Sequence, residues 1–338
     1  MSLYNENKKE HSCLHKVVIR YKSTCIILAI LLCLCFAGCT KSKENDNKKV
    51  ENTITIPVSP TVLASQDSTI EKDISPTEAE VTEAVQHMIN VDFSEYFDGI
   101  EGCAVFFNSD TDIYNLYNEE LCEMRTSPCS TFKIIATIMG LETGVLDSVD
   151  SKMGYDETIY RMNAWNEDLR LQDAFKESCV WYFKKVIDQI GESEVKKYLN
   201  QLEYGNCDIS EWEGSGINSA PELNGFWLES SLEISPMEQV NILADIFNSN
   251  TDFSKQSIDI LKEVMLTQKS GNVSIYGKTG TGQNASTGNR DNGWFVGMFE
   301  RTDERYYFAV HLTDESKEVS GQIAKEIAIN IINGYYTK

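Results

Sequence analysis

The chain has 338 residues, which is enough for a substantial hydrophobic core and for two lobes. It carries 30 basic and 52 acidic residues, a formal net charge of −22. This balance argues against a nucleic-acid partner, because binding to phosphates requires a basic surface. Acidity of this size favours solubility and leaves the fold open.

The first 38 residues differ from the rest of the chain. Basic residues precede the apolar run "CIILAILLCLCFA" (25–37), whose length is typical of a signal peptide and short for a membrane-spanning helix. The run ends in "FAGC", which resembles the processing site of a bacterial lipoprotein. We therefore expect residues 1–38 to be a signal peptide and Cys39 to be lipidated, which would anchor the chain to the outer face of the bacterial cell membrane. The alternative is an uncleaved N-terminal anchor.

Residues 39–87 are rich in Lys, Glu, Asn, Ser, Thr and Pro and poor in large apolar residues, so they are predicted to be a flexible polar tether. Residues 88–338 are predicted to be the catalytic domain. This domain contains five cysteines and no C-x-x-C pair, so we expect no zinc site. Buried free thiols are favoured, and a disulfide stays open as an alternative.

The pattern of apolar residues predicts the order of elements in this domain. Two strands are expected around an Asn-Ser-Asp turn in 102–120, then an apolar helix from Ser130, and a mainly helical lobe over about 148–250. A helix over 254–266, three strands in 272–282, 292–300 and 305–313, and a final helix over about 317–332 follow. The predicted fold class is α+β: an antiparallel sheet built from both chain ends and flanked by helices, a helical lobe, and a cleft between them.

The small number of histidines limits which catalytic mechanisms are possible. Beyond residue 87 only His311 remains, within an apolar strand, so a Ser-His-Asp triad has almost no candidate base. In "SPCSTFK" Ser130 and Lys133 stand one helical turn apart at the start of the apolar helix. Ser130 could simply cap that helix. A buried lysine, however, tends to lose its charge, and a neutral amine beside a hydroxyl is a base beside a nucleophile.

A second motif is Lys278-Thr279-Gly280 in "YGKTGTG". It offers a cation, a hydroxyl and an unobstructed backbone, which suit an anionic substrate along a strand edge. A strand with a glycine bulge is the structural alternative. Ser-x-x-Lys followed well downstream by Lys-Thr-Gly is nevertheless the signature of serine β-lactamases and penicillin-binding proteins.

From about Gly102 to its end the chain resembles the class D (oxacillinase-type) β-lactamases of that superfamily. The matching segments, in the family's order, are "SPCSTFK", Ser178-x-Val180 in "AWNEDLRLQDAFKESCVWYF", "YGN" (204–206), "FWLE" (226–229), "KTGTG" (278–282) and "GWFVG" (293–297). The resemblance implies the serine β-lactamase/penicillin-binding fold, with the active site in the cleft. It also implies hydrolysis of β-lactam antibiotics through an acyl-serine intermediate.

The resemblance implies a role for each of four catalytic residues. Ser130 would be the nucleophile. Lys133 would be carboxylated on its side-chain nitrogen by CO2 or bicarbonate and act as general base. Ser178 and Lys278 would pass a proton to the departing lactam nitrogen. No other cofactor and no metal is implied, and the expected partners are β-lactam substrates and, through the lipid, the membrane.

Six further residues are implied to bind substrate or to surround the lysine: Val180, Trp227, Leu228, Thr279, Gly280 and Thr281. The N–H groups of Ser130 and Thr281 would form the oxyanion hole, and Thr279 would bind the substrate carboxylate. Trp227 would donate a hydrogen bond to the carboxylated lysine, and the two aliphatic side chains would keep it dry.

One departure and two alternative functions stay open. The family's arginine before the last helix is missing; Lys317, Lys325 or, more distantly, Arg290 could replace it. A β-lactam sensor, acylated without turnover, would tend to carry Asn where this chain has Val180 and would need several membrane spans, so it is disfavoured. A penicillin-binding-type peptidase should lack the apolar surroundings of Trp227.

Overall fold

The computed structural model describes residues 87–283, 288–302, 304–314 and 316–337. The predicted signal peptide, Cys39 and nearly all of the predicted tether lie outside these residues. None of the helices in the described ranges is both long and apolar enough to cross a membrane.

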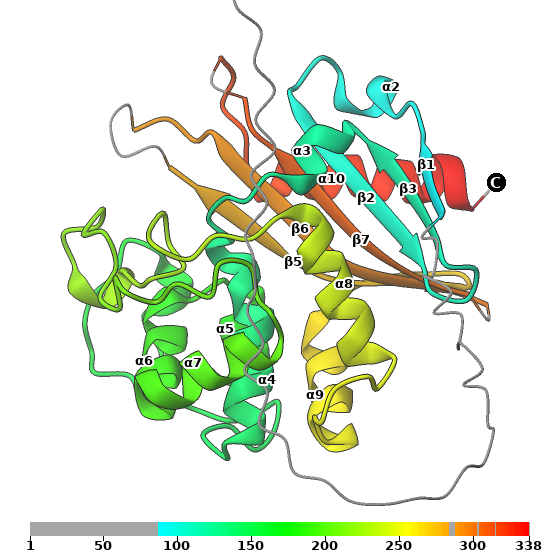
Figure 1. Cartoon of the computed structure of the whole chain (residues 1–338). Helices are drawn as coiled ribbons and strands as arrows, with labels where there is room; N and C mark the ends of the chain where they lie inside the picture. The colour runs from blue at the N-terminus through cyan, green and yellow to red at the C-terminus, as the bar shows by residue number, and fades with distance from the viewer. Residues whose placement is uncertain (1–86, 284–287, 303, 315, 338) are drawn as a thin grey trace, which may run out of the picture. The chain divides into compact units, whose positions relative to one another are not determined.

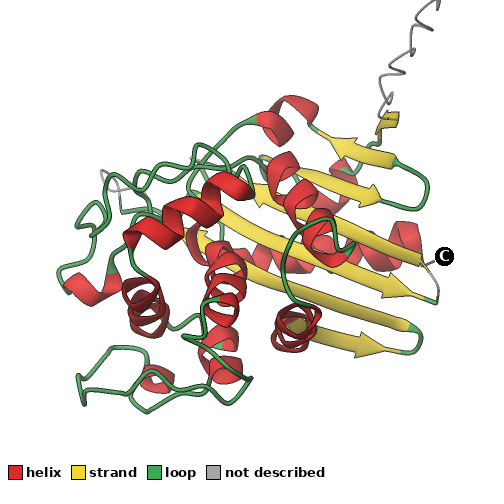
Figure 2. Cartoon of the chain, turned by 60° about the horizontal axis from the view of Figure 1, so that its bottom comes forward, coloured by secondary structure: helices red, strands yellow, loops and turns green. Residues whose placement is uncertain are grey.

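The described chain builds a seven-stranded sheet with the order β1-β3-β2-β7-β6-β5-β4. The strands are β1 (His87–Asn90), β2 (Gly102–Asn108), β3 (Ile113–Tyr117), β4 (Leu266–Ser270), β5 (Val273–Gly282), β6 (Asn292–Arg301) and β7 (Glu304–Leu312). All neighbours are antiparallel except β1 and β3. The pairing of β2 with β7 joins the two ends of the domain in one sheet (Figures 1 and 2). The predicted fold class is therefore confirmed.

Alternation along the central strands explains why the sheet is covered on both faces. On β6, Phe295 and Phe299 pack into one hydrophobic core, whereas Trp294, Val296 and Met298 pack into another. The first core lies under the C-terminal helix α10 (Gly321–Ile331) and the short α2 (Ser94–Phe97). In Figure 1 α10 runs behind the sheet, and α8 (Pro236–Phe247) crosses its other face.

The helical lobe contains α4 (Lys133–Glu142), α5 (Leu171–Lys176), α6 (Val180–Ile190) and α7 (Glu192–Gln201), which lie together beside the sheet in Figure 1. Helix α9 (Lys255–Met265) returns the chain to the sheet, and the short α3 (Glu119–Glu123) precedes the nucleophile segment. The stretch predicted as mostly helical contains long irregular segments on either side of α5–α7, which carry the walls of the site.

Two predicted helix starts were wrong by a few residues. The chain at Ser130 forms a 3-10 turn (Cys129–Phe132), and the α-helix begins only at Lys133. The last helix begins at Gly321 because the Ser320 hydroxyl accepts a hydrogen bond from the N–H of Ile323 and so caps it.

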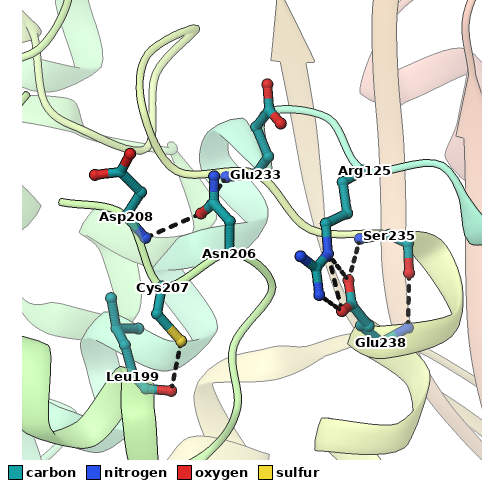
Figure 3. Close-up of polar contacts among 8 residues, drawn as sticks. All are labelled: Arg125, Leu199, Asn206, Cys207, Asp208, Glu233, Ser235 and Glu238. Carbon is teal, nitrogen blue, oxygen red and sulfur yellow. Dashed lines mark hydrogen bonds and ion pairs between the residues drawn. The ribbon is translucent and has the colours of Figure 1, made fainter. Parts of the chain in front are cut away.

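The segment around "YGN" has a structural role (Figure 3). The side-chain oxygen of Asn206 accepts hydrogen bonds from the N–H groups of Asp208 (3.0 Å) and Glu233 (3.1 Å). Gly205 has φ +56°, and a Cβ there would lie 1.9 Å from the carbonyl oxygen of Glu233, so only glycine fits. The turn thus holds the end of the loop 226–234, which carries Trp227 and Leu228 and leads into α8. There Ser235 and Glu238 form a capping box.

Candidate active site

Ser130 and Lys133 face each other at the start of α4. The Lys133 ammonium group donates a hydrogen bond of 2.9 Å to the Ser130 hydroxyl. Neither the 3-10 turn nor α4 has a side-chain hydrogen bond at its N-cap, so the serine does not act as the predicted alternative, a helix cap. The hydroxyl is free to serve as a nucleophile beside a basic group.

Burial tunes Lys133 for this purpose. The side chain is fully inaccessible to solvent, and its Nζ lies 5.5 Å from the centre of the Phe183 ring. Loss of hydration disfavours the charged form, and the pKa of Lys133 falls to about 8. A substantial fraction of the amine is therefore neutral near physiological pH.

Trp227 lies in the same buried region with an unused donor. Its ring stacks on Phe132, the neighbour of Lys133 in the chain, with ring centres 5.4 Å apart. Its indole Nε1–H is buried and has no acceptor among the described residues. An unsatisfied buried donor costs roughly 1–3 kcal/mol. An acceptor oxygen next to this nitrogen would remove that cost.

Lys278 and Ser178 form a second lysine–serine pair. Lys278 is 4% exposed, and its Nζ donates hydrogen bonds to the Ser178 hydroxyl and to the carbonyl oxygen of Thr279 (3.0 Å). Burial, and next the charge of Lys133, hold the pKa of Lys278 well below its ordinary value. Ser178 has φ +54°, a strained conformation for serine, in the tight connection between α5 and α6.

A cavity of about 420 Å³ is lined by five of the ten residues predicted for catalysis and substrate binding. Its walls include Ser130, Ser178, Val180, Leu228, Thr281 and Arg290. Met162 and Trp165, which sequence reasoning did not single out, add an apolar wall from the irregular segment before α5. These residues come from separate segments of the chain, so only the fold assembles them.

Thr279 and Gly280 do not line this larger cavity. Thr279 lines a neighbouring cavity of about 210 Å³ that it shares with Lys278, Lys176 and Lys325. Gly280 brings β5 against the nucleophile turn: a Cβ there would lie 3.0 Å from the carbonyl oxygen of Pro128. The Thr281 hydroxyl accepts a hydrogen bond of 2.9 Å from the N–H of Gly321.

The three residues that could replace the family's missing arginine differ in the cavity that they line. Lys317 donates to the carbonyl oxygen of Gly99 at 2.6 Å and lies in neither cavity. Arg290 lines the larger cavity, and Lys325 lines the smaller one together with Thr279. Gly321, one helical turn before Lys325, packs against the Cβ of Thr279, where an added Cβ would approach to 2.8 Å.

The other reactive side chains are cysteines and possible metal ligands. The five cysteines within the described residues are free thiols, of which Cys207 is half-buried and the other four are buried. Within the described ranges, no group of three His, Cys, Asp or Glu side chains could hold a metal ion. Sequence reasoning also missed Glu229, which lines the larger cavity beside Ser130; its only signal was its place in "FWLE".

Comparison with known proteins places the chain in a family. Residues 101–333 match the family described as penicillin binding protein transpeptidase domain. The chain therefore belongs to the superfamily of penicillin-binding transpeptidases and serine β-lactamases, which confirms the broader resemblance seen in the sequence.

The relatives include both receptors and β-lactamases. The regulatory protein BlaR1 of Bacillus licheniformis is 37% identical over 244 residues, which cover 72% of this chain and 38% of BlaR1. The probable beta-lactamase YbxI of Bacillus subtilis is 33% identical over 248 residues, covering 73% of this chain and 85% of YbxI. The chain thus spans about two fifths of the receptor but most of the β-lactamase.

Solved structures give the same two groups. The C-terminal domain of the Bacillus licheniformis BlaR penicillin-receptor superimposes with a TM-score of 0.66 at 35% identity, over 74% of this chain and 97% of that domain. The class D beta-lactamase BAT-2 superimposes with a TM-score of 0.64 at 29% identity, over 73% of this chain and 96% of BAT-2. The likeness predicted from the sequence to class D β-lactamases is therefore shared with the penicillin receptors.

Proposed function

We propose that the protein is acylated by β-lactam antibiotics at Ser130 and hydrolyses the acyl-enzyme, so that it acts as a β-lactamase. The observation that carries the proposal is the 2.9 Å hydrogen bond between the fully buried Lys133 and Ser130. It places an amine of lowered pKa, part of which is neutral, at the hydroxyl that must lose a proton. The family match and the β-lactamase relatives support the same chemistry.

In acylation the Ser130 oxygen bonds to the lactam carbonyl carbon while its proton passes to the basic group at Lys133. The carbon–nitrogen bond of the ring then breaks. The departing nitrogen takes a proton from Ser178, which regains one from Lys278. The transfers between Ser130 and Lys133 and between Lys278 and Ser178 follow hydrogen-bonded contacts present in the structure. The N–H groups of Ser130 and Thr281 would stabilise the oxyanion.

Carboxylation of Lys133 belongs to this proposal. A neutral buried amine can attack CO2, and the Trp227 indole N–H, which lacks an acceptor, fits an oxygen added there. When present, the carboxylate would supply a general base, unprotonated at neutral pH, for activating the deacylating water. Val180 and Leu228, which line the cavity, would keep this region apolar.

A β-lactam sensor is the second candidate, and the first relatives favour it, because they are the regulatory proteins BlaR1 and a mecR1 protein. The two functions differ only in the fate of the acyl-enzyme. The apolar Val180 at the cavity wall supports turnover in this chain, and so does the buried indole N–H of Trp227, which has no acceptor among the described residues.

The time course of the acyl-enzyme tests the proposal. The full-length protein is mixed with benzylpenicillin, and intact mass and substrate loss are followed together. We expect an adduct on Ser130 that disappears as penicillin is consumed. An adduct that persists for hours would favour the sensor, and the absence of both an adduct and penicillin loss would overturn β-lactam acylation altogether.

The position of the protein in the cell is also a proposal. The "FAGC" box supports lipidation of Cys39 and anchoring at the outer face of the cell membrane, with residues 40–87 as the tether. A β-lactamase held there would meet the antibiotic before it reaches cell-wall enzymes.

A further inference from the structure

A carboxyl group without a cationic partner lies beside the nucleophile. Glu229 lines the same cavity as Ser130. Its Oε1 accepts hydrogen bonds from the Cys129 thiol (3.1 Å) and from the side-chain N–H of Asn292 (3.0 Å). The ion pairs formed among the described residues do not include Glu229. Glu229 is half-buried, and removing even part of the water around a carboxyl group without an ion-pair partner is costly, so this arrangement calls for an explanation.

The first contact fixes the residue before the nucleophile. Cys129 has φ +50°, a left-handed conformation that is unfavourable for a residue with a side chain. Burial raises the pKa of its thiol well above the ordinary value, so the thiol stays protonated and donates to Glu229. Because the peptide that follows Cys129 carries the N–H of Ser130, the conformation of Cys129 sets the direction of that N–H.

Oε1 of Glu229 also lies against the end of β5. A Cβ on Gly282 would lie 1.5 Å from Oε1 of Glu229, so glycine is what lets this strand touch the carboxyl group. Gly282 follows Thr281 and is paired with Asn292 in the sheet. One oxygen atom of Glu229 therefore meets the segments that carry both N–H groups of the expected oxyanion hole.

The partners of Glu229 are themselves held in place. The amide nitrogen of Asn292 also donates to the carbonyl oxygen of Ser127 (3.1 Å), which receives a second bond from the Trp294 indole (3.0 Å). His311 Nε2 lies 3.0 Å from the Asn292 side-chain oxygen. Burial lowers the pKa of His311 to about 3, which keeps the ring neutral. The network is thus anchored in β6 and β7, the rigid centre of the sheet.

We propose that Glu229 is a positioning residue for acyl transfer. Its Oε1 joins the Cys129–Ser130 peptide to the end of β5 and so sets the separation of the Ser130 and Thr281 N–H groups. Both donors must lie about 2.7–3.1 Å from the oxyanion to stabilise it. The inference rests on the proposed acyl-transfer function, because it concerns the oxyanion of that reaction.

Three variants test the role. Glu229→Gln keeps an acceptor oxygen for both donors, and Glu229→Ala removes it. Glu233→Ala, an exposed glutamate of the same loop, is the matched control. Full-length proteins are compared by the first-order acylation rate at saturating β-lactam, by the affinity for the initial non-covalent complex, and by the affinity for a boronic acid that mimics the tetrahedral intermediate.

We expect Glu229→Ala to lower the acylation rate and the boronate affinity together by about ten- to a hundredfold, since small misplacements of catalytic groups cost this much. Non-covalent affinity should stay within about threefold. Glu229→Gln and Glu233→Ala should remain within about threefold of the wild type in all three measurements. If Glu229→Ala does not fold, Cys129→Ala removes the thiol donor alone and should show the same split.

Two results would overturn the inference: wild-type acylation in the variant that lacks the acceptor, or a loss in Glu229→Gln as large as in Glu229→Ala, which would mean that charge matters rather than position. Failure of the proposed function looks different. In that case the wild type itself forms no acyl adduct with any β-lactam.

Discussion

The ammonium group of Lys278 donates a hydrogen bond to the hydroxyl of Ser178, 100 residues earlier in the chain. This bond joins the strand β5 to the connection between α5 and α6, and so ties the sheet to the helical lobe across the cavity. Together with the bond from Lys133 to Ser130 it places two buried lysines, each beside a serine, on one site. Burial, and next the charge of Lys133, lower the pKa of Lys278, which makes Lys278 easier to deprotonate.

The lowered pKa of Lys133 predicts a pH-dependent stability. The pKa is about 8 in the folded protein against an ordinary value of 10.5, so below pH 8 the folded state is destabilised by holding this charge. The penalty shrinks as the pH rises from 8 to 10.5, because the unfolded chain binds more protons in that window. In CO2-free buffer Lys133→Met should therefore be more stable than the wild type at pH 7 by about 3 kcal/mol, the equivalent of this shift.

Urea unfolding at pH 7 and pH 10 measures that difference. The advantage of Lys133→Met should fall towards zero at the higher pH. Lys196→Met, at a lysine whose Nζ bonds the carbonyl oxygen of Cys207 near the surface, is the control and should show no such trend. Equal stability of wild type and Lys133→Met at pH 7 would contradict the lowered pKa.

Bicarbonate dependence tests carboxylation of Lys133. We expect degassed enzyme to lose most of its turnover and to regain it with added bicarbonate. Trp227→Phe removes the indole donor that lacks an acceptor and should need about ten- to a hundredfold more bicarbonate, as the loss of one buried hydrogen bond to a charged group implies. Labelled bicarbonate should give a carbamate carbon signal by NMR. Turnover that ignores bicarbonate, with no such signal, would leave Lys133 acting as a plain amine.

Val180→Asn should move the protein from hydrolase towards sensor. An amide at this wall of the cavity would bring polar groups and water to the region around Lys133, where a dry environment favours the neutral amine that reacts with CO2. Acylation should change little, whereas deacylation should slow by about tenfold or more. Pre-steady-state mass spectrometry separates the two rates, and Val180→Ile serves as the apolar control. Unchanged deacylation in Val180→Asn would remove the main structural argument for turnover.

The substrate carboxylate is predicted to pair with Lys325. This lysine lines the smaller cavity with Thr279 and Lys278, and no carboxylate is among the residues of that cavity. Lys325→Ala should weaken acylation by a penicillin by about tenfold, equivalent to about 1.4 kcal/mol. It should leave acylation by the corresponding methyl ester unchanged. Lys317→Ala, at a lysine outside both cavities, is the control. If Arg290→Ala instead shows the selective loss, the anchor lies in the larger cavity.

Lipidation of Cys39 is checked in cells. Labelled fatty acid should enter the wild type and not Cys39→Ala, and that variant should appear in the culture medium. Cys103→Ala, which alters a buried thiol of the domain, should be labelled like the wild type. Equal labelling of wild type and Cys39→Ala would show that the "FAGC" box is not used.

The sequence by itself determined the fold class and predicted that Ser130 and Lys133 lie side by side. Alternation of apolar residues predicted the strands at both ends of the domain, because a half-buried strand must alternate. Ser130 and Lys133 could be paired because residues three apart on a helical turn share a face. The 3-10 turn at Ser130 keeps them together although the helix begins later than predicted.

Only the tertiary structure decided which distant residues share a cavity. Ser178 and Lys278 were assigned together by resemblance, but their bond depends on how the lobe docks on β5. Lys325 lies on α10 and lines the smaller cavity with Thr279, whereas Lys317 precedes that helix and bonds the carbonyl oxygen of Gly99. Glu229 gave no periodic or compositional signal, since a carboxyl group becomes informative only when burial removes its water and leaves a thiol and an amide as its partners. Burial and long-range contact arise from packing, which local sequence patterns do not encode.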